Sequence, residues 1–300
     1  MLPTADADSP TLSTTDPTRW AFAGRDRTAF MEVGIVAQQD NDRAMQLAEA
    51  IADQLSTPVR LDESTAGALR RDGSPVDTFD ECDLIVSIGG DGTFLFAARG
   101  AGGTPILGVN LGEVGFLNAV DPDGAIDAVE AELTKLQEGT ATIRESPRLA
   151  AYTNGWRSHP ATNEIVVQGD RRGPGGGIGF ETRIDGALYS SGSADGVLVA
   201  TPTGSTAYNM SERGPLVHPG VDGMVLTEMC STGGMPSLVV DDASTIHITV
   251  TDTERAIVVS DGRITESLDA PVDVRIERTD PPLRIAGPPT DFFEALGKLE

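Results

Sequence analysis

A buried strand that runs directly into a glycine-rich loop is the feature that most restricts how this chain can fold. Residues 84–88, Leu-Ile-Val-Ser-Ile, form a continuous apolar, β-branched run, which is typical of a parallel strand covered on both faces. The loop that follows is Gly-Gly-Asp-Gly-Thr at residues 89–93, and the pattern predicts a short helix over residues 94–98. A strand, loop and helix in this order indicate an α/β sheet.

The loop has the composition of a phosphate-binding cradle. Glycines let the backbone turn tightly and approach a ligand closely, and the start of the following helix offers unpaired N–H groups to an anion. Asp91 stands in the middle of this loop. A carboxylate repels bound phosphates unless it accepts a proton from an attacking hydroxyl or holds a metal ion. The alternative is an ordinary turn whose aspartate caps the helix, but three glycines around the acid favour a functional site.

The remaining pattern predicts four segments along the chain. Residues 1–30 are rich in Ser, Thr, Asp and Pro without apolar periodicity, which predicts a disordered tail that is dispensable for folding and activity. Residues 31–140 predict an α/β domain with a Rossmann-like parallel sheet: strands at 31–37, 59–61, 84–88 and 105–109, and helices at 41–55, 94–98 and 123–137.

Residues 141–287 predict a mainly β domain of sandwich type. Its expected strands are at 149–152, 164–168, 180–184, 197–200, 246–250, 256–260 and 272–277. The dipeptides Asp185-Gly186 and Asp261-Gly262 predict hairpin turns. An amphipathic helix at 291–299, within the last segment 288–300, is expected to pack back onto a neighbouring surface.

Charge limits the possible partners. Asp and Glu number 46 against 22 Lys and Arg, for a net charge of −24, so neither nucleic acid nor an anionic membrane surface is an expected partner. This excess favours the protein of a halophile, where salt screens self-repulsion; an acidic mesophilic protein is the alternative. Anionic nucleotides would have to bind through backbone donors, arginines or a metal.

Targeting and cysteine signals favour the cytoplasm. The chain has neither a secretory signal pattern nor an apolar run of about eighteen residues. Its two cysteines, Cys82 and Cys230, are too few for a disulfide framework and have no metal-ligand spacing.

The glycine-rich unit resembles that of NAD kinases and, more distantly, those of diacylglycerol kinases and phosphofructokinases. Further blocks resemble NAD kinases in the same order, and the resemblance spans residues 31–299. The longest is Thr-Pro-Thr-Gly-Ser-Thr-Ala-Tyr at residues 201–208. The others lie at residues 105–112, 115–117, 163–164, 195–196, 211–219 and 259–262. The ordered set is far more specific than the glycine-rich loop alone.

This resemblance implies that the chain phosphorylates the 2′-hydroxyl of the adenosine ribose of NAD to give NADP. Asp91 would accept the proton of that hydroxyl, while Asn163 and Glu164 would hydrogen-bond the dinucleotide and Asp195 would contact its nicotinamide end. The implied phosphate loop is Gly89, Gly90, Gly92 and Thr93. The implied NAD-binding residues are Gly92, Phe116, Asn163, Glu164, Asp195, Thr206, Ala207, Tyr208 and Ser211.

The resemblance also implies ATP or inorganic polyphosphate as the phosphoryl donor, with Mg²⁺ or another divalent metal, and assembly as a homodimer or homotetramer. The sequence assigns no metal ligands. It departs from many relatives at Glu113 and Ser193, where a basic residue is common, and at Arg263, where glutamine is common. Arg263 is a candidate for supplying the positive charge missing elsewhere.

Two alternatives stay open. A related lipid kinase of the diacylglycerol type usually lacks the 201–208 block, and this chain has no evident membrane-facing patch. A non-catalytic sensor of pyridine nucleotides is disfavoured by the intact Asp91. The three histidines, His159, His218 and His247, are scattered along the chain and are interpreted as structural.

Overall fold

The structure is a computed structural model that describes residues 31–112, 115–173 and 175–298 of the chain. The tail predicted over residues 1–30 lies outside the described residues, as does Glu113. Among the helices in these ranges, none combines the length and apolar character that crossing a membrane requires.

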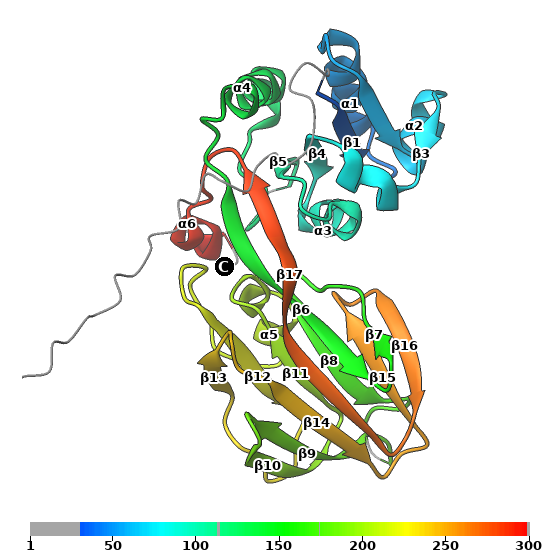
Figure 1. Cartoon of the computed structure of the whole chain (residues 1–300), viewed down its shortest axis with the longest axis vertical. Coiled ribbons are helices and arrows are strands. Elements are labelled where there is room, and N and C mark those ends of the chain that lie inside the picture. Colours follow the sequence, from blue (N-terminus) through cyan, green and yellow to red (C-terminus); the bar gives the residue numbers. More distant parts are fainter. Residues whose placement is uncertain (1–30, 113–114, 174, 299–300) are drawn as a thin grey trace, which may run out of the picture. The chain divides into compact units, whose positions relative to one another are not determined.

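A parallel sheet forms the first part of the described chain (Figure 1). In spatial order its strands are β3 (Gly73–Ser74), β2 (Val59–Asp62), β1 (Val33–Ala37), β4 (Leu84–Gly89) and β5 (Ile106–Asn110). The helices are α1 (Asp42–Gln54), α2 (Glu63–Leu69), α3 (Asp91–Gly100) and α4 (Ala125–Glu138), with short 3-10 segments η2 (Val76–Glu81) and η3 (Pro122–Gly124).

Both faces of β4 are buried, which explains its uninterrupted apolar sequence. Leu84, Val86 and Ile88 pack into a cluster that includes residues of α1 and α4. Ile85 points to the other face, where Phe94 of α3 contributes to a second cluster. Helices on both faces leave no solvent-exposed side that would require alternating polar residues. The predicted buried parallel strand is therefore confirmed.

The later part of the chain forms two sheets, and the first of these continues the parallel sheet. The long strand β17 (Val272–Ala286) pairs parallel with β5 through Ile285 and Ala286, and antiparallel with β6 (Arg144–Thr153) and β14 (Ile246–Thr251). Beyond β14 come β9 (Ile178–Ile184) and β10 (Ala187–Ala194), while β7 (Trp156–Arg157) pairs with β6. The predicted domain boundary near residue 140 falls between α4 and β6.

The second sheet is entirely antiparallel. Its order is β13 (Leu238–Asp241), β12 (Gly223–Met229), β11 (Gly196–Ala200), β8 (Glu164–Gly169), β15 (Arg255–Ser260) and β16 (Ile264–Asp269). Apolar side chains from both sheets, such as Ile248 of β14 and Val167 of β8, share one core cluster. The mainly β, sandwich-type prediction is confirmed, and so are the hairpins at Asp185-Gly186 and Asp261-Gly262, whose residues all have positive φ.

Several elements differ from the sequence-based prediction. Helix α3 begins at Asp91 rather than Phe94, with Gly90 as its N-cap, so the acid of the loop is already part of the first turn. Helix α2 was not predicted because its short Glu-Ser-Thr-Ala-Gly-Ala-Leu sequence lacks a wide apolar stripe; the side chain of Asp62 caps it by accepting from the N–H groups of Ser64 and Thr65. The strands β12 and β13 were also not predicted.

The C-terminal helix α6 (Phe292–Gly297) confirms the predicted element, in shorter form. Asp291 caps it by accepting hydrogen bonds from two backbone N–H groups. The Phe292 ring centroid lies 6.1 Å from that of Phe116 and 5.3 Å from that of His218. The helix thus packs back beside Phe116, which follows the glycine-rich part of the chain in sequence.

Candidate active site

Asp91 is held at the start of α3 by three hydrogen bonds from one neighbouring segment. Its Oδ2 accepts from the backbone N–H of Phe116 at 3.1 Å. Its Oδ1 accepts from the backbone N–H of Leu117 at 3.3 Å and from Nδ2 of Asn118 at 3.1 Å. Strand β4 and residues 116–118 therefore fix the orientation of this carboxylate.

The environment of Asp91 suits a proton acceptor. Burial raises the pKa of Asp91 above its ordinary value, although the three donors oppose that rise. A carboxylate offers roughly four acceptor positions, so three donors leave about one free. Because Oδ1 receives two of the donors and Oδ2 only one, the free position lies on Oδ2. One incoming hydroxyl could donate there.

The glycines of the loop occupy their positions for different structural reasons. A Cβ atom on Gly89 would lie 2.6 Å from Oγ1 of Thr93, so no larger residue fits. A Cβ atom on Gly90 would meet open space, and one on Gly92 would have only Nη2 of Arg263, at 3.7 Å, within 4 Å. Gly90 and Gly92 therefore leave the backbone accessible to a ligand, and the one side chain beside Gly92 is cationic.

Asp261 organises the segment that carries Asn163 and Glu164. Its carboxylate accepts from the backbone N–H groups of Thr162 at 2.9 Å, Asn163 at 2.7 Å and Glu164 at 3.3 Å. Burial raises the pKa of Asp261 although these three donors oppose the rise. The hairpin turn between β15 and β16 thus binds the start of β8.

Glu164 is buried with part of its carboxyl group unsatisfied. The residue is 3% exposed, and its Oε2 has no hydrogen-bond partner. Burial, together with the nearby negative charge of Asp261, raises the pKa of Glu164 to about 8. A hydrogen bond from the Tyr208 backbone N–H opposes this rise in pKa. At neutral pH the group is therefore mostly protonated and able to donate or accept a hydrogen bond. An unsatisfied buried carboxyl oxygen is costly, which suggests a ligand as its partner.

The segment from Thr201 to Ser211 packs against Asn163. Thr201 donates from its backbone N–H to the carbonyl of Asn163 at 2.8 Å. A Cβ atom at Gly204 would collide with that same carbonyl oxygen. The turn η4 (Thr203–Thr206) and the helix α5 (Tyr208–Ser211) follow. They contain the predicted residues Thr206, Ala207, Tyr208 and Ser211.

Asp195 lies between β10 and β11 and is contacted by a different loop, the one that contains Gly173. Its Oδ1 accepts from the backbone N–H of Gly173 at 2.8 Å. The preceding Arg172 donates to the Tyr208 hydroxyl at 2.8 Å, and its guanidinium lies 5.9 Å from the Tyr208 ring centroid. Arg172 thereby joins the Asp195 region to the 201–211 segment. Ser193 is exposed on β10, and its backbone carbonyl accepts a hydrogen bond from the backbone N–H of Thr232.

These contacts connect most of the predicted site residues. Asp91 and Phe116 are joined by a hydrogen bond, and Arg263 links the loop at Gly92 with the Asp261 turn. That turn accepts hydrogen bonds from the backbone N–H groups of Asn163 and Glu164. Further along the network, the Tyr208 hydroxyl accepts a hydrogen bond from Arg172. Among the described residues, Ser211 is not joined to this network by a side-chain hydrogen bond and lies exposed at the end of α5.

Three residues that support the site were not identified from the sequence. Asn118 was missed although it is a polar residue in an apolar stretch just after the 115–117 block. Asp261 was predicted as a hairpin residue and as part of the 259–262 block, but no role in the site was assigned to it. Arg172 was not singled out, because it lies outside every predicted strand, helix and motif. The available signals were the position of Asn118 directly after the 115–117 block and that of Asp261 inside the 259–262 block.

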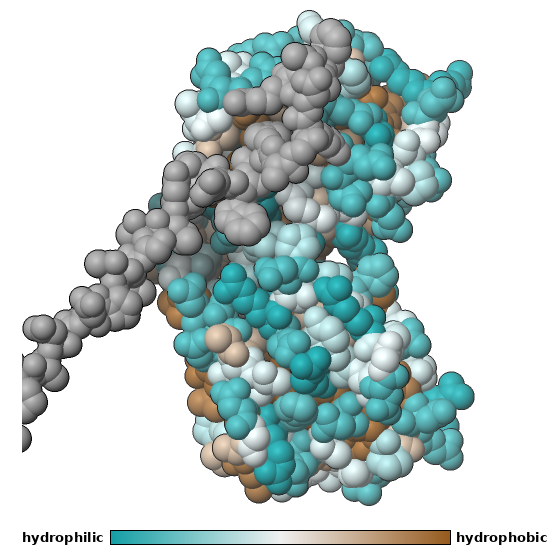
Figure 2. All heavy atoms as spheres, in the orientation of Figure 1, coloured by the Kyte–Doolittle hydropathy of each residue, from teal (hydrophilic) through white to brown (hydrophobic). Residues whose placement is uncertain are grey.

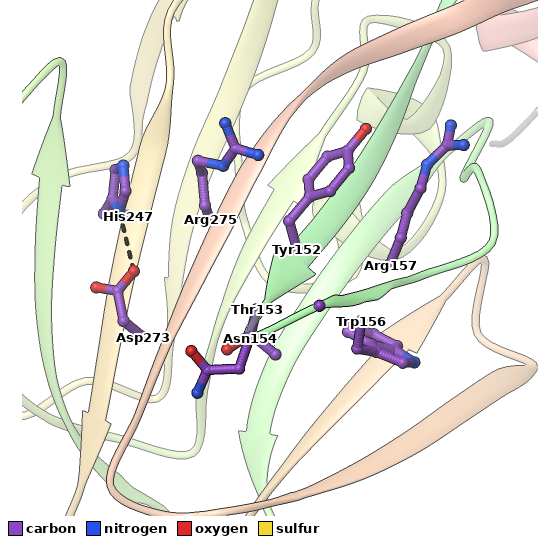
Figure 3. A pocket seen from close by; sticks show the side chains of 9 residues that line it. Tyr152, Thr153, Asn154, Trp156, Arg157, His247, Asp273 and Arg275 are labelled. Atoms are coloured by element: carbon purple, nitrogen blue, oxygen red, sulfur yellow. Dashed lines mark hydrogen bonds and ion pairs between the residues drawn. The ribbon is translucent and has the colours of Figure 1, made fainter.

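The described residues include no cluster of side chains suited to bind a metal ion, and the hollow described below contains none of the predicted site residues. No group of three or more His, Cys, Asp or Glu side chains in these ranges could hold a metal ion. A separate hollow of about 490 Å³ lies on β6, β7, β14 and β17 and contains none of the predicted residues (Figure 3). In it, His247 and Asp273 pair at 3.0 Å, and the Arg275 guanidinium lies 4.7 Å from the Tyr152 ring centroid.

Two family models match the chain. The model of the ATP-NAD kinase N-terminal domain matches residues 33–139, and that of the ATP-NAD kinase C-terminal domain matches residues 162–286. Among similar proteins, the NAD kinase of Halorubrum lacusprofundi is 56% identical over 274 residues, and that of Haloarcula marismortui is 56% identical over 282 residues. Each alignment covers 90% of this chain and 100% of the relative. Both relatives come from halophilic archaea, which agrees with the interpretation of the acidic composition.

Solved structures of NAD and NADH kinases share the fold of this chain. An NAD kinase from Archaeoglobus fulgidus in complex with ATP matches with a TM-score of 0.71 and 28% identity, covering 90% of this chain and 98% of that one. Yeast NADH kinase complexed with NADH matches with a TM-score of 0.77 and 22% identity, covering 90% and 87%. At that lower identity, the yeast enzyme supports the fold alone.

Proposed function

Because this chain belongs to the NAD kinase family, we propose that Asp91 is the general base that accepts the proton of the adenosine ribose 2′-hydroxyl of NAD. The observation that carries this proposal is the constrained carboxylate of Asp91, which keeps one free acceptor position at the edge of an open glycine loop. Phosphoryl transfer depends mainly on positioning and charge neutralisation. A fixed carboxylate that takes the proton as the bond forms is adequate for this.

NAD is proposed to bind between the loop and the segments that Asp261 holds together. Asn163 and Glu164 would hydrogen-bond the dinucleotide, and the unsatisfied Oε2 of Glu164 supports this role. Gly92 and Phe116 would contact it beside Asp91. The wall would be formed by Thr206, Ala207, Tyr208 and Ser211, and Asp195 would contact the nicotinamide end.

ATP is the phosphoryl donor of this family, and we propose that its phosphates meet the loop of Gly89, Gly90, Gly92 and Thr93. Mg²⁺ usually binds through one or two carboxylates together with substrate phosphates, so the absence of a three-ligand cage among the described side chains fits a metal held mainly by ATP. When bound, this ion would neutralise phosphate charge. Polyphosphate remains a second proposed donor.

A homodimer or homotetramer in the cytoplasm is the proposed state of the protein. Apolar side chains on β10 and β13 support the assembly: Leu188 is 55% exposed and Val239 is 43% exposed, and both strands are at sheet edges. Both cysteines are free, which agrees with a reducing compartment. Sedimentation in high salt would measure the assembly directly.

The test of the mechanism compares Asp91→Asn with Asn163→Ala. General bases typically contribute about 10²–10⁴-fold, so Asp91→Asn should lower the turnover number by roughly that factor while NAD affinity changes far less. Asn163→Ala should chiefly weaken NAD binding. Turnover is measured by NADP formation from ATP, and NAD affinity by calorimetry.

Melting temperatures must accompany both measurements, because an amide at position 91 would place an N–H donor or a weaker acceptor among the three donors that now bind the carboxylate. A folded Asp91→Asn protein with near-normal turnover would remove Asp91 as the base. If the unmodified protein forms no NADP from any donor yet binds NAD, the sensor alternative replaces the kinase.

A further inference from the structure

Arg99, in the last turn of α3, and Arg263, beside Gly92, lack the acidic ion-pair partners that several other arginines of this chain have. Acidic residues outnumber basic ones by 46 to 22, and several arginines are paired: Arg60 lies 2.9 Å from Glu32, and Arg278 lies 2.6 Å from Asp242. Within the described ranges, neither Arg99 nor Arg263 forms an ion pair with an acidic side chain. Other described arginines, such as Arg70 and Arg213, form no ion pair either, but Arg99 and Arg263 lie near each other and Arg263 also lies beside Gly92.

Arg99 lies on the same face of α3 as Gly92, the residue that Arg263 approaches from another part of the chain. Gly92 and Arg99 are seven residues apart on this helix, a spacing that returns to the same face after about two turns. Long helical side chains lean toward the helix N-terminus, which directs Arg99 back toward Gly92. From the β15–β16 turn, Nη2 of Arg263 reaches to 3.7 Å from the position of a Cβ on Gly92. Burial and the charge of Arg263 both lower the pKa of Arg99.

Nearby groups leave this positive charge only partly balanced. The charges of Asp261 and Asp77 both act on Arg99, but the oxygens of Asp261 already accept three backbone N–H groups. Arg148, 3% exposed on β6, adds a further cation that interacts with Asp261 and donates to the carbonyl of Gly102. The Nε atoms of Arg99 and Arg148 are both buried without a hydrogen-bond partner. Buried donors left in this state are costly unless a ligand supplies the acceptor.

We propose that Arg99 and Arg263 bind the phosphate chain of the ATP donor where it passes Gly92. Arg263, exposed and next to the loop, would contact the phosphates directly, and Arg99 would neutralise their charge from behind. The need is electrostatic: a chain of net charge −24 repels ATP, and guanidinium groups bind phosphate oxygens strongly. This assignment rests on the proposed kinase function and adds the residues that recognise the donor.

The test uses three single substitutions of equal charge change: Arg263→Gln, Arg99→Gln and, as the control, Arg255→Gln. Arg255 lies on the same hairpin, and its side chain is 62% exposed and 4.0 Å from Asp269. KM for ATP, KM for NAD and kcat are measured at one fixed KCl and Mg²⁺ concentration. Charged hydrogen bonds contribute enough that loss of Arg263 should raise KM for ATP about tenfold to a hundredfold, with KM for NAD within about twofold.

Arg99→Gln should also raise KM for ATP, and Arg263→Lys should restore part of the affinity, since a lysine keeps the charge but not the planar fork. Calorimetric titration of ATP with Mg²⁺ into protein without NAD checks binding independently of turnover. An unchanged affinity for ATP in both glutamine variants, with normal melting temperatures, would overturn the proposal. A rise in KM for NAD alone would instead assign these arginines to the dinucleotide diphosphate. If the unmodified protein makes no NADP, the kinase function fails first, whatever the arginine variants bind.

Discussion

At the scale of single residues, Glu164 couples the site to pH. Burial raises its pKa to about 8 from a reference value of 4.5, so the folded state retains a proton that the unfolded chain has already lost in that range. The folded state is therefore favoured below pH 4.5 and loses this advantage as pH rises toward 8. Above pH 8 both states are ionised, and the contribution of Glu164 no longer changes.

This pH dependence predicts the behaviour of Glu164→Gln, which keeps a neutral side chain of similar size. Relative to the unmodified protein, the variant should gain stability as pH rises from about 5 to 8. Melting temperatures of both proteins, taken across this range at constant KCl, measure the difference. Asp91, whose pKa burial also raises, is present in both proteins and cancels in the comparison. Asp261 interacts directly with Glu164, so the change in its titration is part of the measured difference. A difference independent of pH would mean that Glu164 ionises normally in the folded state.

At the scale of elements, η4 packs closely against Asn163, which precedes β8 and belongs to the proposed NAD site. Gly204→Ala would drive a methyl group into the carbonyl of Asn163. Overpacking of this kind costs about 1–3 kcal/mol. We expect a lower melting temperature and a raised KM for NAD, because Asn163 must move. KM for ATP should change little.

Gly67→Ala is the matched control for Gly204→Ala. Gly67 lies within helix α2, and a Cβ atom there would meet nothing within 4 Å. Alanine is favoured over glycine inside a helix by roughly 0.5–1 kcal/mol, so the control should stabilise the protein slightly without a kinetic effect. Equal kinetic effects of the two variants would show that the η4 contact does not shape the site.

At the scale of the whole molecule, the charge of −24 makes stability depend on salt. The face in Figure 2 is largely hydrophilic, with apolar groups in scattered patches. Raising KCl from 0.1 to 1 M shortens the Debye length from about 10 Å to about 3 Å, which screens repulsion between carboxylates. The melting temperature should therefore rise steeply up to molar KCl.

Lower pH provides the control for this salt effect. The sequence pI is about 4.3, so at pH 5 fewer carboxylates are charged and the rise with KCl should be shallower than at pH 7. A melting temperature independent of KCl at pH 7 would contradict the halophilic interpretation. It would leave the family assignment unchanged, because that depends on the matched domains and relatives.

The sequence by itself determined the elements whose signals are local. The apolar run of β4, the loop that contains Asp91 and the two Asp-Gly hairpins were all predictable, because burial on both faces and positive φ angles restrict which residues can occupy those positions. The ordered motifs also identified the family. Local signals failed for α2, which depends on a side-chain cap and on packing rather than on a wide apolar stripe.

Only the tertiary structure decided which distant groups meet. Asn118 binds Asp91, Asp261 binds the backbone before β8, and Arg263 reaches Gly92. Asp261 and Asn163 are 98 residues apart in sequence, and no local propensity encodes such a contact. The same is true of β17, which joins the parallel sheet to the antiparallel strands through β5. The pKa of Glu164 follows from burial and from the nearby Asp261, and both arise only when the separate segments pack together.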